Sequence, residues 1–200
     1  MLRNNWPYPA LLGIAALLIV LQLVTESGVT ELSYQRQAIL AAMPWRLISG
    51  HFVHANLIHM AMNLAALILL AGLIPEKNRN YLLPVVIVVA LLTGGFLLLM
   101  EPQLEHYVGL SGVLHGLSVV IGIWLWREHA ISGPVLLLLL LLTKIVLEQS
   151  GLLDTNSTES LIDMRVATEA HLWGAVSGVI LCAMSALAQR LSRALGRGGE

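Results

Sequence analysis

The sequence contains six long apolar segments, and this feature restricts the chain to a membrane-embedded helical fold. A helix needs about 20 mostly apolar residues to cross the hydrocarbon layer, because its backbone polar groups must be satisfied within the segment. Six segments approach or exceed this length, at residues 7–24, 45–74, 81–100, 107–126, 131–147 and 167–187. We therefore predict an all-α polytopic membrane protein, in which six transmembrane helices form a single domain over residues 1–200.

The composition agrees with this fold and excludes several other classes of protein. Hydrophobic residues make up 57% of the chain, and a net charge of −1 does not suit a disordered chain. The 11 basic residues are balanced by 12 acidic ones, which excludes a basic nucleic-acid binder. Cys182 is the single cysteine and cannot form an internal disulfide, and no Cys/His spacing resembles a zinc site. We expect no metal and no cofactor.

The distribution of basic residues predicts the orientation in the membrane. The first apolar segment is longer than a typical signal-peptide core and no clear cleavage site precedes Glu26, so we expect a retained helix. Six crossings place both termini on one side. A cytoplasmic N-terminus gives seven basic residues inside and three outside, in agreement with the positive-inside rule. The inner set is Arg3, Lys77, Arg79, Arg127, Arg190, Arg193 and Arg197, and the outer set is Arg36, Arg46 and Arg165.

Polar side chains within the apolar segments are the candidate functional residues, because such groups are costly in a membrane. They are His54, His59 and Asn63 in the second segment, Ser111 and His115 in the fourth, and His171 in the sixth. The pairs His59/Asn63 and Ser111/His115 are each separated by four residues, so each pair shares one helix face. Near the end of the fifth segment, Lys144 can snorkel or pair with Glu148 one turn later.

Glycines accompany these polar residues on two of the segments. They are Gly109, Gly112 and Gly116 around Ser111, and Gly174 and Gly178 after His171. Small residues at such spacing allow two helix backbones to approach closely. Packing the two glycine-lined faces together would bring the Ser111 hydroxyl toward the His171 imidazole, which is the arrangement of a base-activated serine nucleophile. His59 and Asn63 are then candidates for stabilising the oxyanion of an attacked carbonyl.

These motifs resemble those of the rhomboid family of intramembrane serine proteases. Trp45-Arg46 followed by His54-Ala-Asn-Leu-Ile-His59-Met-Ala-Met-Asn63 is similar to the family's WR and H-x4-H-x3-N signature. Gly109-Leu110-Ser111-Gly112 matches the G-x-S-G motif, and the segment 170–178 matches the AHxxGxxxG motif of the last core helix. The three motifs occur in the order of the family, so the resemblance implies a rhomboid-like six-helix bundle.

The resemblance also implies the role of each site residue. Ser111 would be the nucleophile and His171 the general base, in a dyad without an acidic third member. His59, Asn63 and the Ser111 backbone N–H would form the oxyanion hole in a water-filled cavity open to the outer face. His54 and Arg46 would support the first loop and the second helix. The connection from Thr25 to Pro44 would be the loop that lies partly in the membrane plane in rhomboids.

One residue departs from the family pattern and indicates a branch. His115 stands where many rhomboids have a tyrosine that stacks on the catalytic histidine, and we expect it to support His171 rather than replace it. The short chain and the sequence GLSGVLHG most resemble the rhombosortase branch, which processes bacterial proteins that carry a C-terminal Gly-Gly motif, a transmembrane helix and a basic end. This implies a bacterial inner-membrane enzyme whose site opens to the periplasm and whose substrate is a single-pass membrane protein.

Two other functions are compatible with parts of the sequence. A catalytically inactive rhomboid-like protein would keep the fold and bind membrane clients without cutting them, although both Ser111 and His171 are present. A membrane transporter or a haem-carrying membrane protein is suggested by the seven histidines, but haem needs two facing histidines and no G-x-S-G motif. The HExxH motif of metalloproteases is missing. The sequence does not reveal whether a small membrane companion protein takes part.

Overall fold

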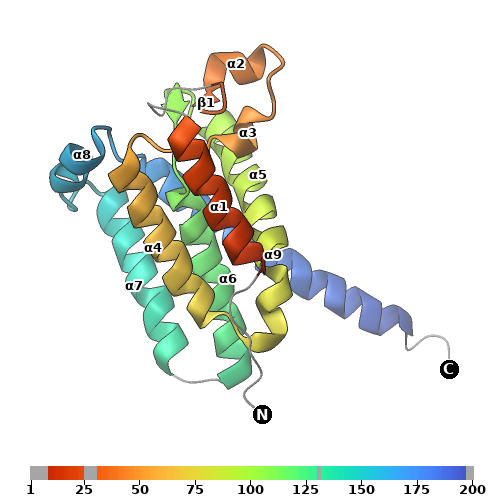
Figure 1. The fold of residues 1–200 in the computed structure, drawn as a ribbon. Helices are drawn as coiled ribbons and strands as arrows, with labels where there is room; N and C mark the ends of the chain where they lie inside the picture. The colour runs from red at the N-terminus through yellow and green to blue at the C-terminus, as the bar shows by residue number, and fades with distance from the viewer. Residues whose placement is uncertain (1–8, 25–30, 130–131, 197–200) are drawn as a thin grey trace.

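The protein is a bundle of long helices whose short α-helices and strands lie at one end (Figure 1). A computed structural model describes residues 9–24, 31–129 and 132–196, so Arg3, Glu26 and Arg197 of the charge pattern lie outside the described residues. The helices are α1 (Pro9–Val24), α2 (Arg36–Leu40), α3 (Arg46–Ser49), α4 (Leu57–Leu73), α5 (Leu82–Met100), α6 (Ser111–His129), α7 (Ser132–Gln149), α8 (Asn156–Ile162) and α9 (Thr168–Gly196). A 3-10 helix, η1 (Glu76–Tyr81), leads into α5.

The outer surface of the bundle is apolar, as a lipid environment requires. Two helical stretches of the described residues are long and apolar enough to cross a membrane, Glu76–Met100 and Thr168–Leu195. The apolar helices α1 and α4 are shorter, with 16 and 17 residues. Large hydrophobic side chains are exposed on most of the long helices, for example Leu23, Leu69, Leu99, Leu136 and Met184. An exposed apolar surface of this extent suits a helical membrane bundle, and six crossings remain a prediction.

The second apolar segment does not form one continuous helix from Trp45, as the sequence analysis predicted. The helix α3 ends at Ser49, and α4 begins at Leu57 after a loop. Asn56 caps α4, because its side chain accepts a hydrogen bond of 2.9 Å from the His59 backbone N–H. The prediction that His54 lies within the span is therefore wrong. His54 lies in the loop before α4, where it is fully buried.

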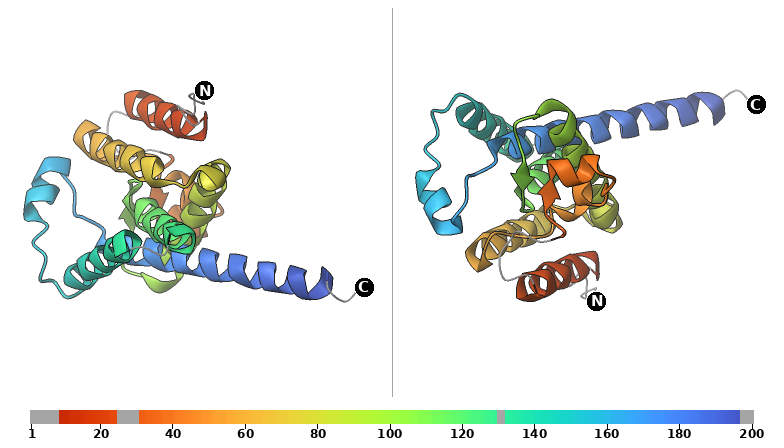
Figure 2. Two further views of the ribbon diagram at one scale, coloured as in Figure 1. Left: turned by 90° about the horizontal axis from the view of Figure 1, so that it is seen from below. Right: turned by 90° about the horizontal axis from the view of Figure 1, so that it is seen from above.

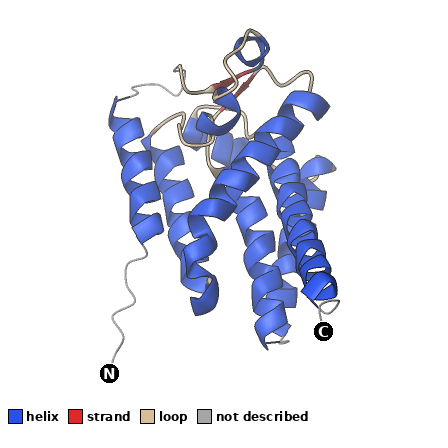
Figure 3. Ribbon diagram, turned by 90° about the vertical axis from the view of Figure 1, so that its right-hand side faces the viewer, coloured by secondary structure: helices blue, strands red, loops and turns tan. Residues whose placement is uncertain are grey.

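A small antiparallel sheet fixes the chain before α3 against the chain before α6. Strands β1 (Tyr34–Gln35) and β2 (His106–Tyr107) pair with Tyr34 opposite Tyr107, and both strands lie at the same end of the bundle as α2 and α3 (Figure 3). Buried Arg46 supports this end, because its guanidinium donates to Glu31 at 2.7 Å and to the Ser33 carbonyl at 2.9 Å. The Arg46 side chain thus contacts the first loop, which the family resemblance predicts that it supports.

The closest packing in the bundle joins α6 to α9. A Cβ atom added at Gly112 would lie 2.8 Å from the Ala170 carbonyl oxygen, and one added at Gly116 would lie 2.5 Å from that of Gly174. A Cβ atom at Gly174 would overlap the Gly112 carbonyl. The two backbones therefore touch along a line that only glycine permits. Seen along the bundle, α6 lies near the centre, and α9 crosses beside it and extends beyond the other helices (Figure 2).

Candidate active site

Ser111 is the first residue of α6, and a glycine with a positive φ precedes it by two positions. Gly109 has a positive φ of +114°, and a Cβ atom there would lie 2.6 Å from His59 Cε1. Both conditions exclude other residues, since L side chains rarely adopt this backbone conformation. The first backbone N–H groups of a helix have no intrahelical acceptor. The Ser111 hydroxyl therefore lies at the positive end of a helix dipole.

His171 lies in the first turn of α9 and faces Ser111. Its Nε2 atom is 3.0 Å from Ser111 Oγ, which is hydrogen-bond distance. The glycine contacts of α6 and α9 bring these helix ends together, because Gly112 follows the serine directly and touches Ala170, which precedes the histidine. The two residues are 60 positions apart in the chain, so the packing of the two helices creates the pair.

A carboxylate contacts the other nitrogen of His171, contrary to the expectation of a dyad without an acidic neighbour. Both Oε atoms of Glu148, in the last turn of α7, lie 3.0 Å from His171 Nδ1. Glu148 is buried. The spacing in the sequence predicts Glu148 only as a partner of Lys144. The available signal was an acidic residue in a leucine-rich helix, but the spacing did not indicate that it reaches α9.

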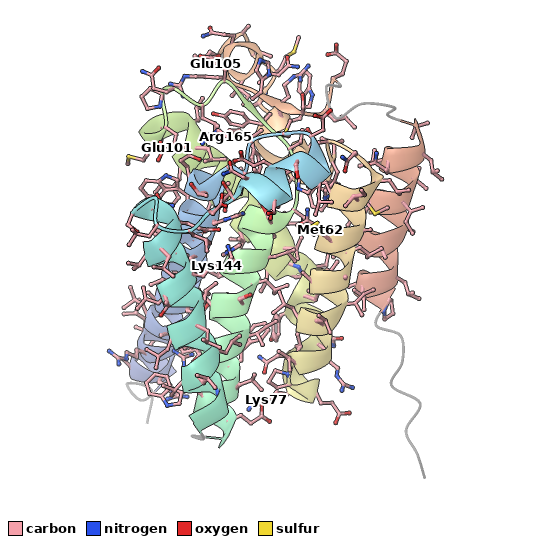
Figure 4. The ribbon with its side chains drawn as sticks, turned by 90° about the vertical axis from the view of Figure 1, so that its left-hand side faces the viewer. Met62, Lys77, Glu101, Glu105, Lys144 and Arg165 are labelled. Carbon is pink, nitrogen blue, oxygen red and sulfur yellow. The ribbon has the colours of Figure 1, made fainter. Side chains whose placement is uncertain are left out.

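Lys144 joins the same cluster from one turn earlier on α7, near α6 (Figure 4). Its Nζ atom lies 2.5 Å from Glu148 Oε1, which confirms the predicted pairing, and 3.0 Å from His115 Nε2. The ring of His115 stacks on that of His171, with a centroid distance of 4.1 Å and an interplanar angle of 12°. His115 Nδ1 also lies 2.7 Å from the Ser111 carbonyl oxygen. The structure thus brings together Ser111, His115 and His171, as well as two residues of α7.

His59 and Asn63 approach the same loop from α4. A Cβ atom at Gly109 would lie 2.7 Å from His59 Nε2 and 3.7 Å from Asn63 Nδ2, so both side chains face the residues that precede Ser111. Asn63 Nδ2 donates to the His59 carbonyl at 3.1 Å. An amide nitrogen carries two hydrogens, so Asn63 retains a second donor.

His54 contacts His59 and does not contact Ser111 directly. The two rings make an edge contact, with a centroid distance of 5.0 Å. Burial, followed by the proximity of His59, lowers the pKa of His54 to about 3, so that its imidazole is neutral. These contacts suit a residue that fixes the orientation of His59.

A cavity of about 870 Å³ connects these residues. Its polar part includes Ser111, His59, Asn63, His115, His171, Lys144 and Glu148, and much of the rest is lined by apolar side chains of α4, α6, α7 and α8. The helix α8 crosses between α4 and α7 at the end where Arg165 lies, opposite to Lys77 (Figure 4). Asn56 at the start of α4 donates to the Leu161 carbonyl of α8 at 3.0 Å. The cavity is therefore amphipathic, with its polar groups beneath α8.

The ligand-type atoms of His115, Glu148 and His171 lie within 4.8 Å of one another, which raises the question of a metal site. The geometry does not suit one. The two stacked imidazoles hold their in-plane lone pairs in nearly parallel planes, so the two rings do not converge on one ion. The Lys144 ammonium already brings a positive charge to the space between the three groups.

Comparison with known families now identifies the fold. The rhomboid domain matches residues 41–187. This chain belongs to the rhomboid family. The match contains every candidate residue described above, from Arg46 to Gly178, and the family comprises intramembrane serine proteases. This rhomboid protein is thus a multi-pass membrane protein that contacts the lipid bilayer through its apolar helices. No curated protein sequence matches the chain significantly.

Proposed function

We propose that this rhomboid protein is an intramembrane serine endopeptidase, in which Ser111 is the nucleophile and His171 the general base. The observation that carries the proposal is the distance of 3.0 Å between Ser111 Oγ and His171 Nε2. The pair lies at a helix N-terminus and lines an amphipathic cavity. A serine hydroxyl becomes nucleophilic when a neighbouring base accepts its proton.

The chemistry follows from the positions of these groups. Ser111 Oγ attacks the carbonyl carbon of the scissile peptide bond while His171 Nε2 takes the hydroxyl proton. The tetrahedral intermediate then collapses, the C–N bond breaks, and His171 donates this proton to the leaving amine. Water hydrolyses the acyl-enzyme by the same sequence of proton transfers, which regenerates Ser111.

The oxyanion of this intermediate needs donors that are already in place. The Ser111 backbone N–H, the second hydrogen of Asn63 Nδ2 and the His59 ring lie around Gly109, and all of them border the cavity. His115 supports the base by stacking on it. The supporting residues of the loop and packing are His54, Arg46, Gly109, Gly112, Gly174 and Gly178.

The active site opens to the outer face of the membrane in this proposal, and both termini are cytoplasmic. The acidic residues Glu101 and Glu105 lie at the end of the bundle that holds α8, while basic Lys77 lies at the other end (Figure 4). The positive-inside rule assigns the Lys77 end to the cytoplasm. Reporter fusions after residue 197 and within residues 150–166 test this topology, and a periplasmic C-terminus would overturn it.

The proposed substrate is a single-pass membrane protein with a glycine-containing stretch near the outer end of its transmembrane segment. An intact helix shields its carbonyl groups through i to i−4 hydrogen bonds, so the segment must unwind before Ser111 attacks. Glycine lowers the cost of unwinding by about 1 kcal/mol relative to alanine. The resemblance to rhombosortases favours a C-terminal Gly-Gly tail in a bacterial inner membrane.

The decisive experiment is incubation of the purified protein with a Gly-Gly-tailed membrane substrate, with the cleavage site located by mass spectrometry. Ser111→Ala and His171→Ala should both abolish turnover while the proteins remain folded, because the two residues act as a unit. Cleavage by Ser111→Ala at a rate comparable to that of the unmodified protein would refute the proposal. A substrate whose glycines are replaced by leucine should be inserted normally but cut more slowly.

A further inference from the structure

The hydrogen-bonding capacities of the groups around His171 fix where each proton lies. The Ser111 carbonyl can only accept, so His115 Nδ1 carries a hydrogen and donates it over 2.7 Å. His115 Nε2 is then a lone pair, which accepts from the Lys144 ammonium at 3.0 Å. His115 therefore has both ring nitrogens engaged and is not available as a second base.

The partners of His171 fix the position of its ring proton in the same way. A carboxylate accepts only, so His171 Nδ1 carries a hydrogen and donates it to Glu148. Nδ1 and the Lys144 ammonium are then both donors, and their separation of 3.5 Å is a proximity without a hydrogen bond. His171 Nε2 is left as a lone pair that points to Ser111 Oγ. Glu148 thus selects the one neutral tautomer that can accept the serine proton.

Burial of Glu148 makes the role of Lys144 necessary. The Glu148 side chain is 3% exposed, and burial disfavours the charged form of a carboxyl group. A protonated carboxyl would lose its negative charge and with it the ability to stabilise an imidazolium. Lys144, whose side chain is 42% exposed, supplies a compensating positive charge at 2.5 Å. The cluster is neutral before reaction, and proton transfer to His171 places the new positive charge against Glu148.

We propose that Glu148 is a positioning residue that completes a Ser111–His171–Glu148 relay, with Lys144 holding its carboxylate in place. This proposal rests on the proposed function and adds an acidic member to its catalytic pair. The carboxylate acts through His171, because its side chain is 3% exposed and its oxygens are engaged by His171 and Lys144. It holds the imidazole in the required tautomer and orientation and stabilises the imidazolium that forms as Ser111 attacks.

The test uses a fluorophosphonate probe, which needs no knowledge of the substrate. Ser111 Oγ attacks the phosphorus atom, fluoride leaves, and the serine proton passes to His171 Nε2. In the detergent-solubilised full-length protein, Glu148→Gln should lower kinact by on the order of 10²–10⁴, as loss of the carboxylate does in other serine hydrolases. The probe KI should stay within about threefold, because the Glu148 side chain is 3% exposed and its oxygens are already engaged by His171 and Lys144.

Glu169→Gln is the matched control. Glu169 is an acidic residue two positions before His171, but its carboxylate pairs with Arg165 at 3.0 Å. This variant should label within about threefold of the unmodified protein, and Glu148→Asp should label faster than Glu148→Gln because it keeps the charge. Equal kinact values for Glu148→Gln and Glu169→Gln would overturn the proposal. If Glu148→Gln does not fold, Glu148→Asp is compared with Glu169→Asp instead. Glu148→Asp should label at least about tenfold more slowly than Glu169→Asp, and equal rates would overturn the proposal.

The pH dependence of labelling separates positioning from general structural support. The charged and titratable groups that face His171 are Lys144 and Glu148 from α7, His115 from α6, His59 from α4, and Glu169 on its own helix. Removal of the Glu148 charge disfavours the imidazolium, so the acidic limb of the kinact profile should move to lower pH. An unmoved limb would contradict the relay. Failure of the unmodified protein to label at Ser111 and to cleave substrate would instead overturn the proposed function itself.

Discussion

Substitution of Gly116 by alanine tests whether the contact between α6 and α9 sets the geometry of the site. The added methyl group would lie 2.5 Å from the Gly174 carbonyl oxygen and 2.5 Å from Val89 Cγ1 of α5, and the valine side chain can move away more easily than the backbone. Reaching an ordinary contact distance of 3.4 Å requires a movement of about 0.9 Å, and a helix backbone cannot rotate away as a side chain can. A parallel separation of the helices would stretch the Ser111–His171 distance from 3.0 Å to about 3.9 Å, beyond hydrogen-bond range.

The expected result is a large loss of activity with a moderate loss of stability. A displacement of about 1 Å in a catalytic pair costs on the order of 10² in rate. Overpacking costs about 1–3 kcal/mol, and part of this is offset by the gain of about 0.5–1 kcal/mol that alanine brings to a helix interior. Gly116→Ala should therefore label with the fluorophosphonate about 100-fold more slowly, while a net cost of up to about 2.5 kcal/mol lowers its melting temperature by up to about 10 °C.

Gly95→Ala is the control for this experiment, because a Cβ atom at Gly95 of α5 meets nothing within 4 Å. It should keep the original labelling rate and a melting temperature at least as high as that of the unmodified protein. Labelling of Gly116→Ala at the rate of Gly95→Ala would refute the reasoning. It would mean that the two helix ends are held together by contacts other than the glycine line.

Two further predictions concern α4 and the loop before it. Asn63→Ala should reduce kcat by on the order of 10²–10³ without abolishing cleavage, since one oxyanion donor is lost, and an unchanged kcat would assign Asn63 a structural role. Burial lowers the pKa of His51 to about 4 from the ordinary value of 6.5, so the unfolded chain binds a proton in this window that the folded chain does not. Stability should consequently fall as the pH decreases from about 6.5 to about 4, and His51→Gln should lessen this fall in thermal melts, while buried His54 continues to contribute to it. Melting curves that fall equally in both proteins would exclude a contribution from His51.

Much of the architecture could be predicted from the sequence, because lipid imposes a simple length rule on apolar segments. The six apolar runs correspond to the long helices, and the glycine rows correspond to the contact of α6 with α9. The predicted start of α4 was wrong. The apolar residues in the loop after α3 are buried inside the protein, so in the sequence they are indistinguishable from part of a transmembrane segment. The side chain of Asn56 marks the true boundary.

The acidic member of the site could not be predicted, for a different reason. The four-residue spacing of Lys144 and Glu148 indicated their pairing, which is a local relation within one helix. The contact of Glu148 with His171 depends on how α7 docks against α9, and 23 residues separate the two positions. Gln149 assists this docking, since its side chain donates to the Thr168 carbonyl at 3.0 Å. No periodicity in the sequence encodes such a contact.

The glycine contacts between α6 and α9 bear on which step of the proposed reaction is rate-limiting. Because both members of the proposed catalytic pair lie at helix ends in backbone contact, neither needs to move to meet the other, and we expect little reorganisation during proton transfer. The slow event should then be delivery of an unwound peptide into the cavity. Small electrophiles bypass that event, so differences in turnover between membrane substrates, relative to one fixed electrophile, report differences in the free energy of exposing a peptide bond in the bilayer. Substitutions in the substrate helix should change this relative turnover, whereas changes in its leaving group should not.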